Sequence, residues 1–220
     1  MQADNDARVD NVPVKPGGSP FALGVKTFFD RLVAIIGLIV LSPLLLLIAG
    51  LIAITSPGPI FFRQIRSGWH GEPFSIFKFR TMVVDAEKLG LGAQTTGSDP
   101  RVTSVGRVLR TLSLDELPQL INIARGDMSL IGPRPTLPYQ VERYTERQRG
   151  RLLRRPGVTG WAQIHGRKSL SWPQRIEHDI WYVEHWSLWL DIRIALRTIP
   201  VVFGAEGVDD SGAGDEISRR

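Results

Sequence analysis

The chain has 220 residues, of which 43% are hydrophobic, enough for one globular domain with a core of its own. Lysine and arginine outnumber aspartate and glutamate by 27 to 22, and a net charge of +5 fits an anionic partner such as a phosphate ester, an anionic lipid or a nucleic acid. The sequence contains no cysteine, which excludes disulfides and thiolate metal sites, and its four histidines have no metal-ligand spacing.

The two ends of the chain are predicted to be disordered tails. Residues 1–20 are rich in Asp, Asn, Pro and Gly without apolar periodicity, and residues 206–220 have the same character. Such segments bury too little apolar surface to offset the entropy lost on folding. We therefore expect the ordered part between them, as an apolar segment over residues 21–62 and a domain over residues 63–205.

The apolar segment has no charged residue between Arg31 and Arg63. A helix over residues 32–55 would be about 36 Å long, enough to cross a bilayer. Ser42 and Pro43 interrupt it near the middle, where proline removes a backbone hydrogen bond and bends the helix. Basic residues flank both ends, so the positive-inside rule is best satisfied by a hairpin that keeps both ends in the cytoplasm. A kinked span tolerates the proline as well, and the residue pattern leaves both open.

The remainder has the character of a soluble domain. A turn signal, with Pro57, Gly58 and Pro59, separates it from the apolar segment. The run EPFSIFKFRTM alternates like a short strand, and SLDELPQLINIARGD has apolar residues at helical spacing with Gly126 placed to end the helix. These elements predict a small α/β domain that is mainly helical.

The stretch from residue 172 to residue 203 is predicted to be mostly helical and is unusually aromatic. Its large rings are Trp172, Trp181, Tyr182, Trp186 and Trp189. Tryptophan and tyrosine beside arginine suit amphipathic helices that lie at a lipid headgroup interface. Packing of the same rings into the core explains the composition equally well, and the sequence leaves the two explanations open.

An acidic pair, Asp115 and Glu116, is the strongest candidate for chemistry. The simplest explanation is structural, because Ser113 followed by Glu116 fits a capping box, in which both side chains bind backbone N–H groups. Pro118 favours a helix that starts closer to the pair, which would leave both carboxylates at an exposed helix end. A helix N-terminus attracts anions, so a phosphate group would meet the carboxylates there.

A phosphate beside two carboxylates needs cations around it. Arg107, Arg110 and Arg134 are available, and Mg²⁺ bound by one carboxylate would serve as well. The run GPRP predicts a stiff loop that presents Arg134 with little entropy to lose. Together these groups suit phosphoryl transfer, in which a carboxylate attacks phosphorus and cations stabilise the phosphoryl oxygens.

Several longer runs carry a resemblance to a known family. They are, in order, SPGPIFFRQIRSG, FKFRTM, SDPRVTSVGRVLRTLSLDELPQLINIARGDMSLIGPRP, RRPGVTGWAQIHGR and HDIWYVEHWSLWLDI. Through them the chain, from about residue 28 to residue 203, resembles the bacterial sugar transferases, which are monotopic polyprenyl-phosphate phosphoglycosyltransferases, and in particular their small PglC-like members. One short motif would mean little, but these runs occur in the family's order and cover most of the ordered chain.

The resemblance implies a membrane topology and a nucleophile. Family members carry the apolar segment as a re-entrant helix that breaks at a Ser-Pro pair and leaves both ends in the cytoplasm, and Ser42 and Pro43 match that pair. The family's Asp-Glu dyad falls on Asp115 and Glu116. By this resemblance Asp115 attacks the β-phosphate of a UDP-sugar and Glu116 holds Mg²⁺.

The resemblance also implies substrate-binding residues. Arg110 and Arg134 match positions that grip the phosphate. Further residues match positions that support the pocket or lie near the nucleotide. They are Arg80, Asp99, Arg101, Thr159, Gly160 and Gln163.

The implied reaction moves a phosphosugar from a UDP-sugar to polyprenyl phosphate, undecaprenyl phosphate in most bacteria, and releases UMP. It would initiate a surface glycan such as an exopolysaccharide, an O-antigen or a glycoprotein glycan. The implied location is the cytoplasmic face of the bacterial inner membrane, in contact with lipids of the cytoplasmic leaflet and without nucleic acid. The run HGRKSLSW occupies a stretch that varies with the sugar, so the sugar stays open, as does the oligomeric state.

One alternative from another class is a membrane-anchored module that binds anionic lipid or nucleic acid without catalysis. It explains the positive net charge and the apolar segment. It gives no joint role to Asp115, Glu116 and the GPRP loop.

Overall fold

The structure is a computed structural model that describes residues 13–86, 99–166 and 170–203. The tail predicted for residues 206–220 and the first part of the tail predicted for residues 1–20 lie outside these ranges. Residues 13–19 differ from the predicted disorder, because they lie against the domain. The N–H of Gly17 donates to the carbonyl of Val183 at 2.9 Å, and Val14 packs on two clusters of the core.

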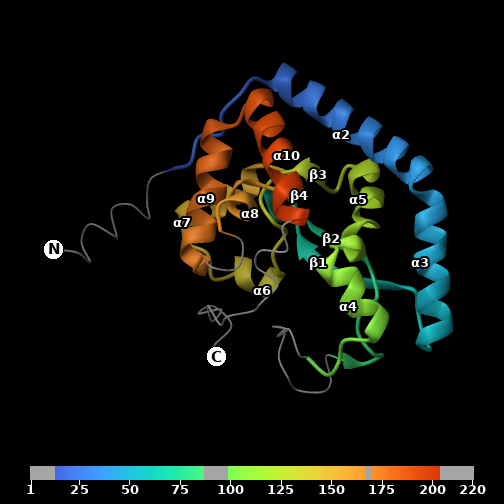
Figure 1. Cartoon of the computed structure of the whole chain (residues 1–220). Coiled ribbons are helices and arrows are strands. Elements are labelled where there is room, and N and C mark those ends of the chain that lie inside the picture. The colour runs from blue at the N-terminus through green and yellow to red at the C-terminus, as the bar shows by residue number, and fades with distance from the viewer. Residues whose placement is uncertain (1–12, 87–98, 167–169, 204–220) are drawn as a thin grey trace.

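Two apolar helices follow, α2 (Pro20–Val40) and α3 (Ser42–Thr55), bent by 63° at Leu41. Ser19 caps α2 by accepting a hydrogen bond from the N–H of Ala22. Figure 1 shows the pair as an arch along one side of the domain. Among the described residues no single helix is long and apolar enough to cross a membrane, and this bent pair is the one that meets the length and composition criteria only when its two helices are taken together.

The bend lies where the sequence predicts it. The hydroxyl of Ser42 donates to the carbonyl of Ile39 at 2.7 Å, and Pro43 lies in the first turn of α3, where its missing N–H costs no helical hydrogen bond. The continuous helix considered for residues 32–55 is therefore divided into two.

Two short sheets form the centre of the domain. Strands β1 (Phe61–Ser67) and β2 (Pro73–Phe79) form an antiparallel hairpin around the short helix η1 (Trp69–Gly71). Strands β3 (Ser129–Ile131) and β4 (Gly157–Thr159) pair in parallel. The strand predicted from the alternation in EPFSIFKFRTM is confirmed as β2.

Helices make up most of the rest, which confirms the mainly helical α/β class. They are α4 (Ser104–Thr111), η3 (Leu114–Glu116), α5 (Gln119–Arg125), α6 (Pro138–Val141), α7 (Glu146–Arg149), η4 (Gly150–Leu153), α8 (Trp161–Ile164), α9 (Trp172–His185) and α10 (Leu188–Phe203). Helix α5 ends as predicted at Gly126, whose φ of 91° is the left-handed conformation that glycine adopts at little cost.

The arch packs on the elements that carry the acidic pair. From α2, Ala34 packs with Ile123 of α5 and Ile76 of β2 in one buried cluster. From α3, Ile48 and Ile52 form a second cluster with side chains of β2 and α4. Full burial of each such side chain contributes about 1.5–3 kcal/mol. The sequence region expected in the membrane and the region expected to carry chemistry are therefore one packed unit.

The aromatic residues of α9 and α10 divide between the two explanations left open by the sequence. Tyr182 and Trp186 are 1% and 2% exposed and belong to the core, where both donate hydrogen bonds to Asp191. Trp189 is 71% exposed on α10, in a stripe with other exposed apolar side chains. Core packing accounts for the first two residues, and Trp189 is left at the surface.

We expect Gly106→Ala to destabilise the fold, because the added Cβ would lie 2.1 Å from the carbonyl oxygen of Thr81 and would push α4 off β2. Overpacking of this kind costs about 1–3 kcal/mol of unfolding free energy. Gly50→Ala in α3 is the matched control, since nothing lies within 4 Å of its added Cβ, and it should stabilise by about 0.5–1 kcal/mol. Denaturant unfolding in detergent measures both, and equal stability of the two variants would contradict the close contact at Gly106.

Candidate active site

The acidic pair lies in a tight turn between α4 and α5. Asp115 and Glu116 belong to η3, and Pro118 precedes the first residue of α5. Ser113, before the turn, has a left-handed backbone with φ of 55° and makes no side-chain cap, so the capping box considered for Ser113 and Glu116 does not form. A non-glycine residue in this conformation costs about 1–3 kcal/mol and is maintained only by the structure around it.

Glu116 is instead held by two cations from distant parts of the chain. Its Oε1 accepts hydrogen bonds from Nζ of Lys78 on β2, at 2.8 Å, and from Nη2 of Arg134 after β3, at 2.6 Å. Burial by itself would raise the pKa of Glu116, but Arg134 and Lys78 outweigh it and hold the pKa well below its ordinary value. Glu116 is therefore a fixed anion, and it holds both cations beside Asp115.

Asp115 has a different environment. It is half-buried, and within the described part of the chain neither of its carboxylate oxygens has a hydrogen-bond partner. Burial raises the pKa of Asp115, Glu116 adds to the rise, and Lys78, Arg110 and Arg134 act in the opposite direction. A carboxylate that is close to three cations but bonded to none of them can attack an electrophile without first breaking an ion pair.

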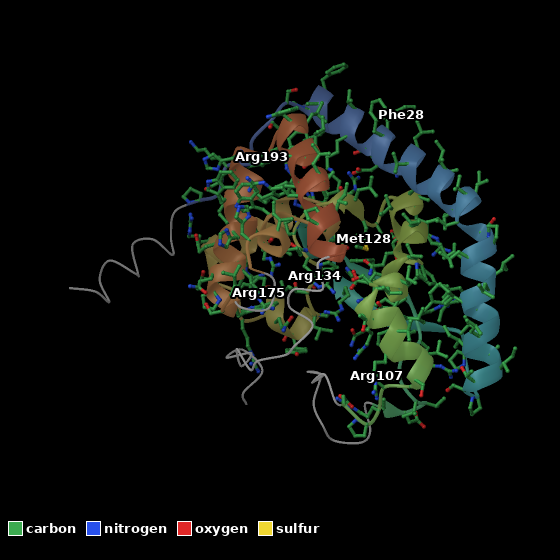
Figure 2. The ribbon with its side chains drawn as sticks, viewed as in Figure 1. Phe28, Arg107, Met128, Arg134, Arg175 and Arg193 are labelled. Carbon is green, nitrogen blue, oxygen red and sulfur yellow. The ribbon has the colours of Figure 1, made fainter. Side chains whose placement is uncertain are left out.

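Arg110 reaches the site from α4. Its Nε donates to the hydroxyl of Thr81 at 3.0 Å, which positions the guanidinium after β2. The structure therefore brings four of the predicted groups, Asp115, Glu116, Arg110 and Arg134, into one cluster. The predicted cation Arg107 is exposed on α4, at the edge of the domain in Figure 2.

The GPRP loop that carries Arg134 is anchored by its backbone. The N–H of Gly132 donates to the carbonyl of Thr159, and the N–H of Gly157 donates to the carbonyl of Pro133, both at 2.9 Å. Gly160 lies so close that an added Cβ would be 2.2 Å from the carbonyl oxygen of Gly132. The loop is thus rigid, but the side chain of Arg134 is 50% exposed. Figure 2 labels Arg134 near the centre of the view. Thr159 and Gly160 hold this loop in place.

The other predicted residues have contacts of their own. Arg80 donates from its two terminal nitrogens to the carbonyls of Ser56 and Pro57, each at 2.6 Å, and so ties the end of α3 to β2. Asp99 and Arg101 form a buried ion pair at 2.6 Å, and the hydrogen bond from Arg101 lowers the pKa of Asp99. These three residues support the framework around the cluster.

Gln163 on α8 has unused hydrogen-bonding capacity at both polar atoms of its side-chain amide. Both polar atoms of its side-chain amide are buried, and neither has a partner within the described residues. Its Oε1 lies 3.0 Å from the position of a Cβ added to Gly160, so it adjoins the turn that holds the GPRP loop. Buried amide groups without partners are rare, and a ligand would satisfy this one.

Two functional candidates were not singled out in the sequence. Lys78 lies in the quoted run FKFRTM. The strand alternation in this run already predicts that its side chain lies on the opposite face of β2 from Phe77 and Phe79. Arg66 on β1 is close to Arg134 only because the chain returns after β3, and no local pattern indicates this.

Arg66 is a cation without an acidic partner among the described residues. It donates to the side chain of Gln64 at 2.6 Å and to the carbonyl of Pro135 at 3.4 Å, and its buried Nε has no partner. Burial first, and then repulsion from Arg134, lower the pKa of Arg66 to about 10. Two guanidiniums this close favour a polyanion between or above them.

Comparison with known proteins agrees with the resemblance noted above. The family described as "Bacterial sugar transferase" matches residues 21–205. The chain is 43% identical over 196 residues to "Exopolysaccharide production protein ExoY" of Sinorhizobium fredii, a match that covers 83% of this chain and 87% of the relative.

Two longer relatives match over less than half of their own length. One is "UDP-glucose:undecaprenyl-phosphate glucose-1-phosphate transferase" of Escherichia coli, 41% identical over 87% of this chain and 44% of the relative. The other is "UDP-N-acetylgalactosamine-undecaprenyl-phosphate N-acetylgalactosaminephosphotransferase" of Aeromonas hydrophila, 44% identical over 85% of this chain and 46% of the relative. With the family match across nearly the whole described chain, the protein is an enzyme of the bacterial sugar transferase family.

Proposed function

We propose that this enzyme transfers a phosphosugar from a UDP-sugar to undecaprenyl phosphate and releases UMP, through a covalent intermediate on Asp115. The observation that carries the proposal is the Asp115 carboxylate, unbonded within the described chain and surrounded by Lys78, Arg110 and Arg134. The names of two relatives support the donor and acceptor classes, and the name of a third supports a role in exopolysaccharide initiation.

The reaction proceeds by two displacements at one phosphorus atom. An oxygen of Asp115 attacks the β-phosphorus of the UDP-sugar, and the bond from this phosphorus to the oxygen bridging the two phosphates breaks. UMP leaves with that electron pair. A phosphate oxygen of undecaprenyl phosphate then attacks the same phosphorus, and the bond to Asp115 breaks. The products are undecaprenyl-diphosphate sugar and the original carboxylate, and no net proton transfer is needed.

The cations around Asp115 stabilise the phosphoryl oxygens in both steps. The side chain of Arg134 is half-exposed, so its guanidinium can turn toward a bound diphosphate while it keeps its ion pair with Glu116. Arg110 approaches from α4 and Lys78 from β2. Because the fold already gathers the three cations around Asp115 before the substrate binds, little reorganisation is needed in the transition state.

Glu116 suits the Mg²⁺ expected from the resemblance. Mg²⁺ is commonly held by one or two carboxylates together with substrate phosphates. Both cations contact Oε1 of Glu116, and within the described residues Oε2 has no contact, so this oxygen is available as a ligand. The described residues contain no group of three or more His, Cys, Asp and Glu side chains that forms a metal site without the substrate. Bound Mg²⁺ would supply positive charge to the phosphate oxygens.

The apolar surface of the arch supports a re-entrant membrane position. Exposed apolar side chains occur on both helices of the arch and on α10. They are Phe28, Phe29, Ile36, Ile39, Val40, Leu46, Leu47 and Ile54 on the arch, and Trp189, Ile192, Leu196 and Ile199 on α10. A patch of this size would be unfavourable in water and suits lipid. We place both ends of the chain on the cytoplasmic side of the inner membrane, where a soluble donor and a lipid acceptor can meet.

The nucleotide is proposed to bind near the turn from β4 to α8. Gln163 has a buried amide without partners among the described residues, and Gly160 keeps the backbone of this turn close to the Arg134 loop. One relative is named for the transfer of glucose 1-phosphate and another for the transfer of N-acetylgalactosamine phosphate, so the sugar of this enzyme is left open.

Asp115→Asn should lower UMP release by about a thousandfold or more while the fold is retained, because an amide cannot form the acyl phosphate. Incubation of the parent protein with UDP-sugar and Mg²⁺, without lipid, should add the mass of one phosphosugar, and the variant should show no addition. Glu72→Gln, which removes an exposed carboxylate, is the charge-matched control and should keep full activity. If Asp115→Asn keeps its activity, Asp115 is not the nucleophile.

Lys78→Met should move the acid limb of the pH–rate profile to higher pH. Asp115 reacts as the anion, so the rate falls as pH drops through its pKa. Lys78 lowers that pKa, and its removal should raise it by about one unit or more. The dependence of kcat/KM on pH at saturating Mg²⁺ measures the shift. Arg107→Gln removes an exposed cation of the same helix as Arg110 and should leave the limb in place; an unshifted limb in Lys78→Met would argue against Asp115 as the titrating group.

Arg66→Met should raise the KM for the UDP-sugar on the order of tenfold to a hundredfold, as expected for loss of a charge-assisted contact. Arg66→Lys should restore part of the affinity, because it keeps the charge. Arg63→Met, at an exposed position on the same strand, should change KM little. Steady-state kinetics with varied donor measures the three, and an unchanged KM in Arg66→Met would place the diphosphate elsewhere.

A further inference from the structure

A cavity with charged residues in its wall lies outside the cluster around Asp115. It has a volume of about 150 Å³ and lies between the first half of α2, η1, β3 and the segment before β4. Lys26, Asp30, Trp69, Arg154 and Arg155 line it. None of the residues assigned to phosphosugar transfer is among its lining residues, so the cavity needs an explanation of its own.

Arg154 is the strongest sign of a ligand there. Arg154 is only 9% exposed, and its buried Nε has no hydrogen-bond partner among the described residues. One terminal nitrogen donates to the carbonyl of Gly17, and the guanidinium lies 4.9 Å from the ring centre of Trp186. Within the described chain Arg154 has no ion pair with a carboxylate, and a buried guanidinium in this state favours an anion beside it.

Arg155 adds a second cation to the same wall. Its guanidinium lies 4.4 Å from the ring centre of Trp69, and its Nε donates to the carbonyl of Gly126 at 2.9 Å. Among the described residues it has no ion pair either, and burial, with Arg31 nearby, lowers its pKa. Its Nη1 also donates to the hydroxyl of Thr27 at 3.4 Å, and the remaining N–H groups at the edge of the planar group can donate to a second partner.

The carboxylates near the cavity are already satisfied by other donors. Asp30 accepts from the hydroxyl of Ser129 at 2.6 Å and pairs with Lys26 at 3.2 Å. Asp191 pairs with Lys26 at 2.6 Å and accepts from the hydroxyl of Tyr182 at 2.8 Å. Asp191 and Asp30 therefore attract Arg154 and Arg155 only from a distance, and neither arginine has a direct ion pair among the described residues.

An apolar hollow adjoins the cavity on the outer face of α2. It is lined by Phe21, Val25, Phe28 and Phe29, and Gly24 lines both spaces. Nothing lies within 4 Å of a Cβ added to Gly24, so a larger side chain can be placed at this shared residue. Phe28 is 64% exposed and projects from α2 away from the domain in Figure 2.

We propose that the cavity binds the phosphate headgroup of an acidic membrane phospholipid, with Arg154 and Arg155 at the phosphate and the acyl chains against the phenylalanines of α2. Two cations without a direct ion pair, beside an adjoining apolar surface, fit an amphiphile better than a free anion. This inference rests on the proposed membrane position of α2 and is independent of the chemistry at Asp115. Such a lipid would hold α2 at a fixed depth beside the site.

The test is thermal unfolding of the full chain, purified and delipidated in detergent, during titration with phosphatidylglycerol or phosphatidylcholine in mixed micelles. Phosphatidylglycerol should raise the midpoint temperature saturably by several degrees, as a ligand of the folded state does, and phosphatidylcholine should not. The double variant Arg154→Gln, Arg155→Gln should need at least tenfold more phosphatidylglycerol for half of the effect. Arg193→Gln, Arg197→Gln removes the same charge from exposed positions on α10 and should respond as the parent.

A second variant keeps the test decisive if the double variant unfolds. Gly24→Phe leaves both arginines in place and puts a large side chain at the residue that lines both spaces, so it should abolish the saturable response. The proposal is overturned if Gly24→Phe responds like the parent, if the control double variant loses the response equally, or if inorganic phosphate alone reproduces it. Asp115→Asn should retain the lipid response, so failure of the catalytic proposal is distinguishable from failure of this one.

Discussion

The ion-pair contact of Glu116 with Lys78 and Arg134 is the interaction on which the site depends. Its partners are 38 and 18 residues away in the sequence, so one carboxylate joins β2, η3 and the loop after β3. The contact keeps two cations beside Asp115 without bonding Asp115 itself. Loss of Glu116 would leave both cations to pair with the neighbouring carboxylate, and Asp115 would then have to break that pair before attacking phosphorus.

The two adjacent carboxylates therefore differ in their protonation behaviour. The pKa of Glu116 is lowered because the charges of Arg134 and Lys78, together with their hydrogen bonds, outweigh its burial. The pKa of Asp115 is raised because burial outweighs cations that do not contact it. Environments that separate the pKa values of neighbouring acids commonly separate their roles. Glu116 suits a fixed anion that organises the site, and Asp115 suits the more reactive nucleophile.

The same elements also connect the site to the arch. Helix α2 packs on α5 through Ala34 and Ile123, and Arg80 ties the end of α3 to β2, the strand of Lys78. A membrane position of α2 and α3 would thus be transmitted to the cluster by direct packing. The cavity beside the first half of α2, with Arg154 and Arg155, is the place where we propose that a lipid contacts the same helix.

The sequence by itself determined the features that depend on local backbone rules: the break at Ser42 and Pro43, the alternating strand β2 and the end of α5 at Gly126. It also identified the acidic pair and the two arginines of the cluster, because the runs around them resemble a known family. Only the tertiary structure decided what the side chains contact. Long-range ion pairs draw Glu116 away from the cap suggested by Ser113, and chain return after β3 places Arg66 beside Arg134. Such contacts join residues far apart in sequence, so local sequence patterns do not predict them.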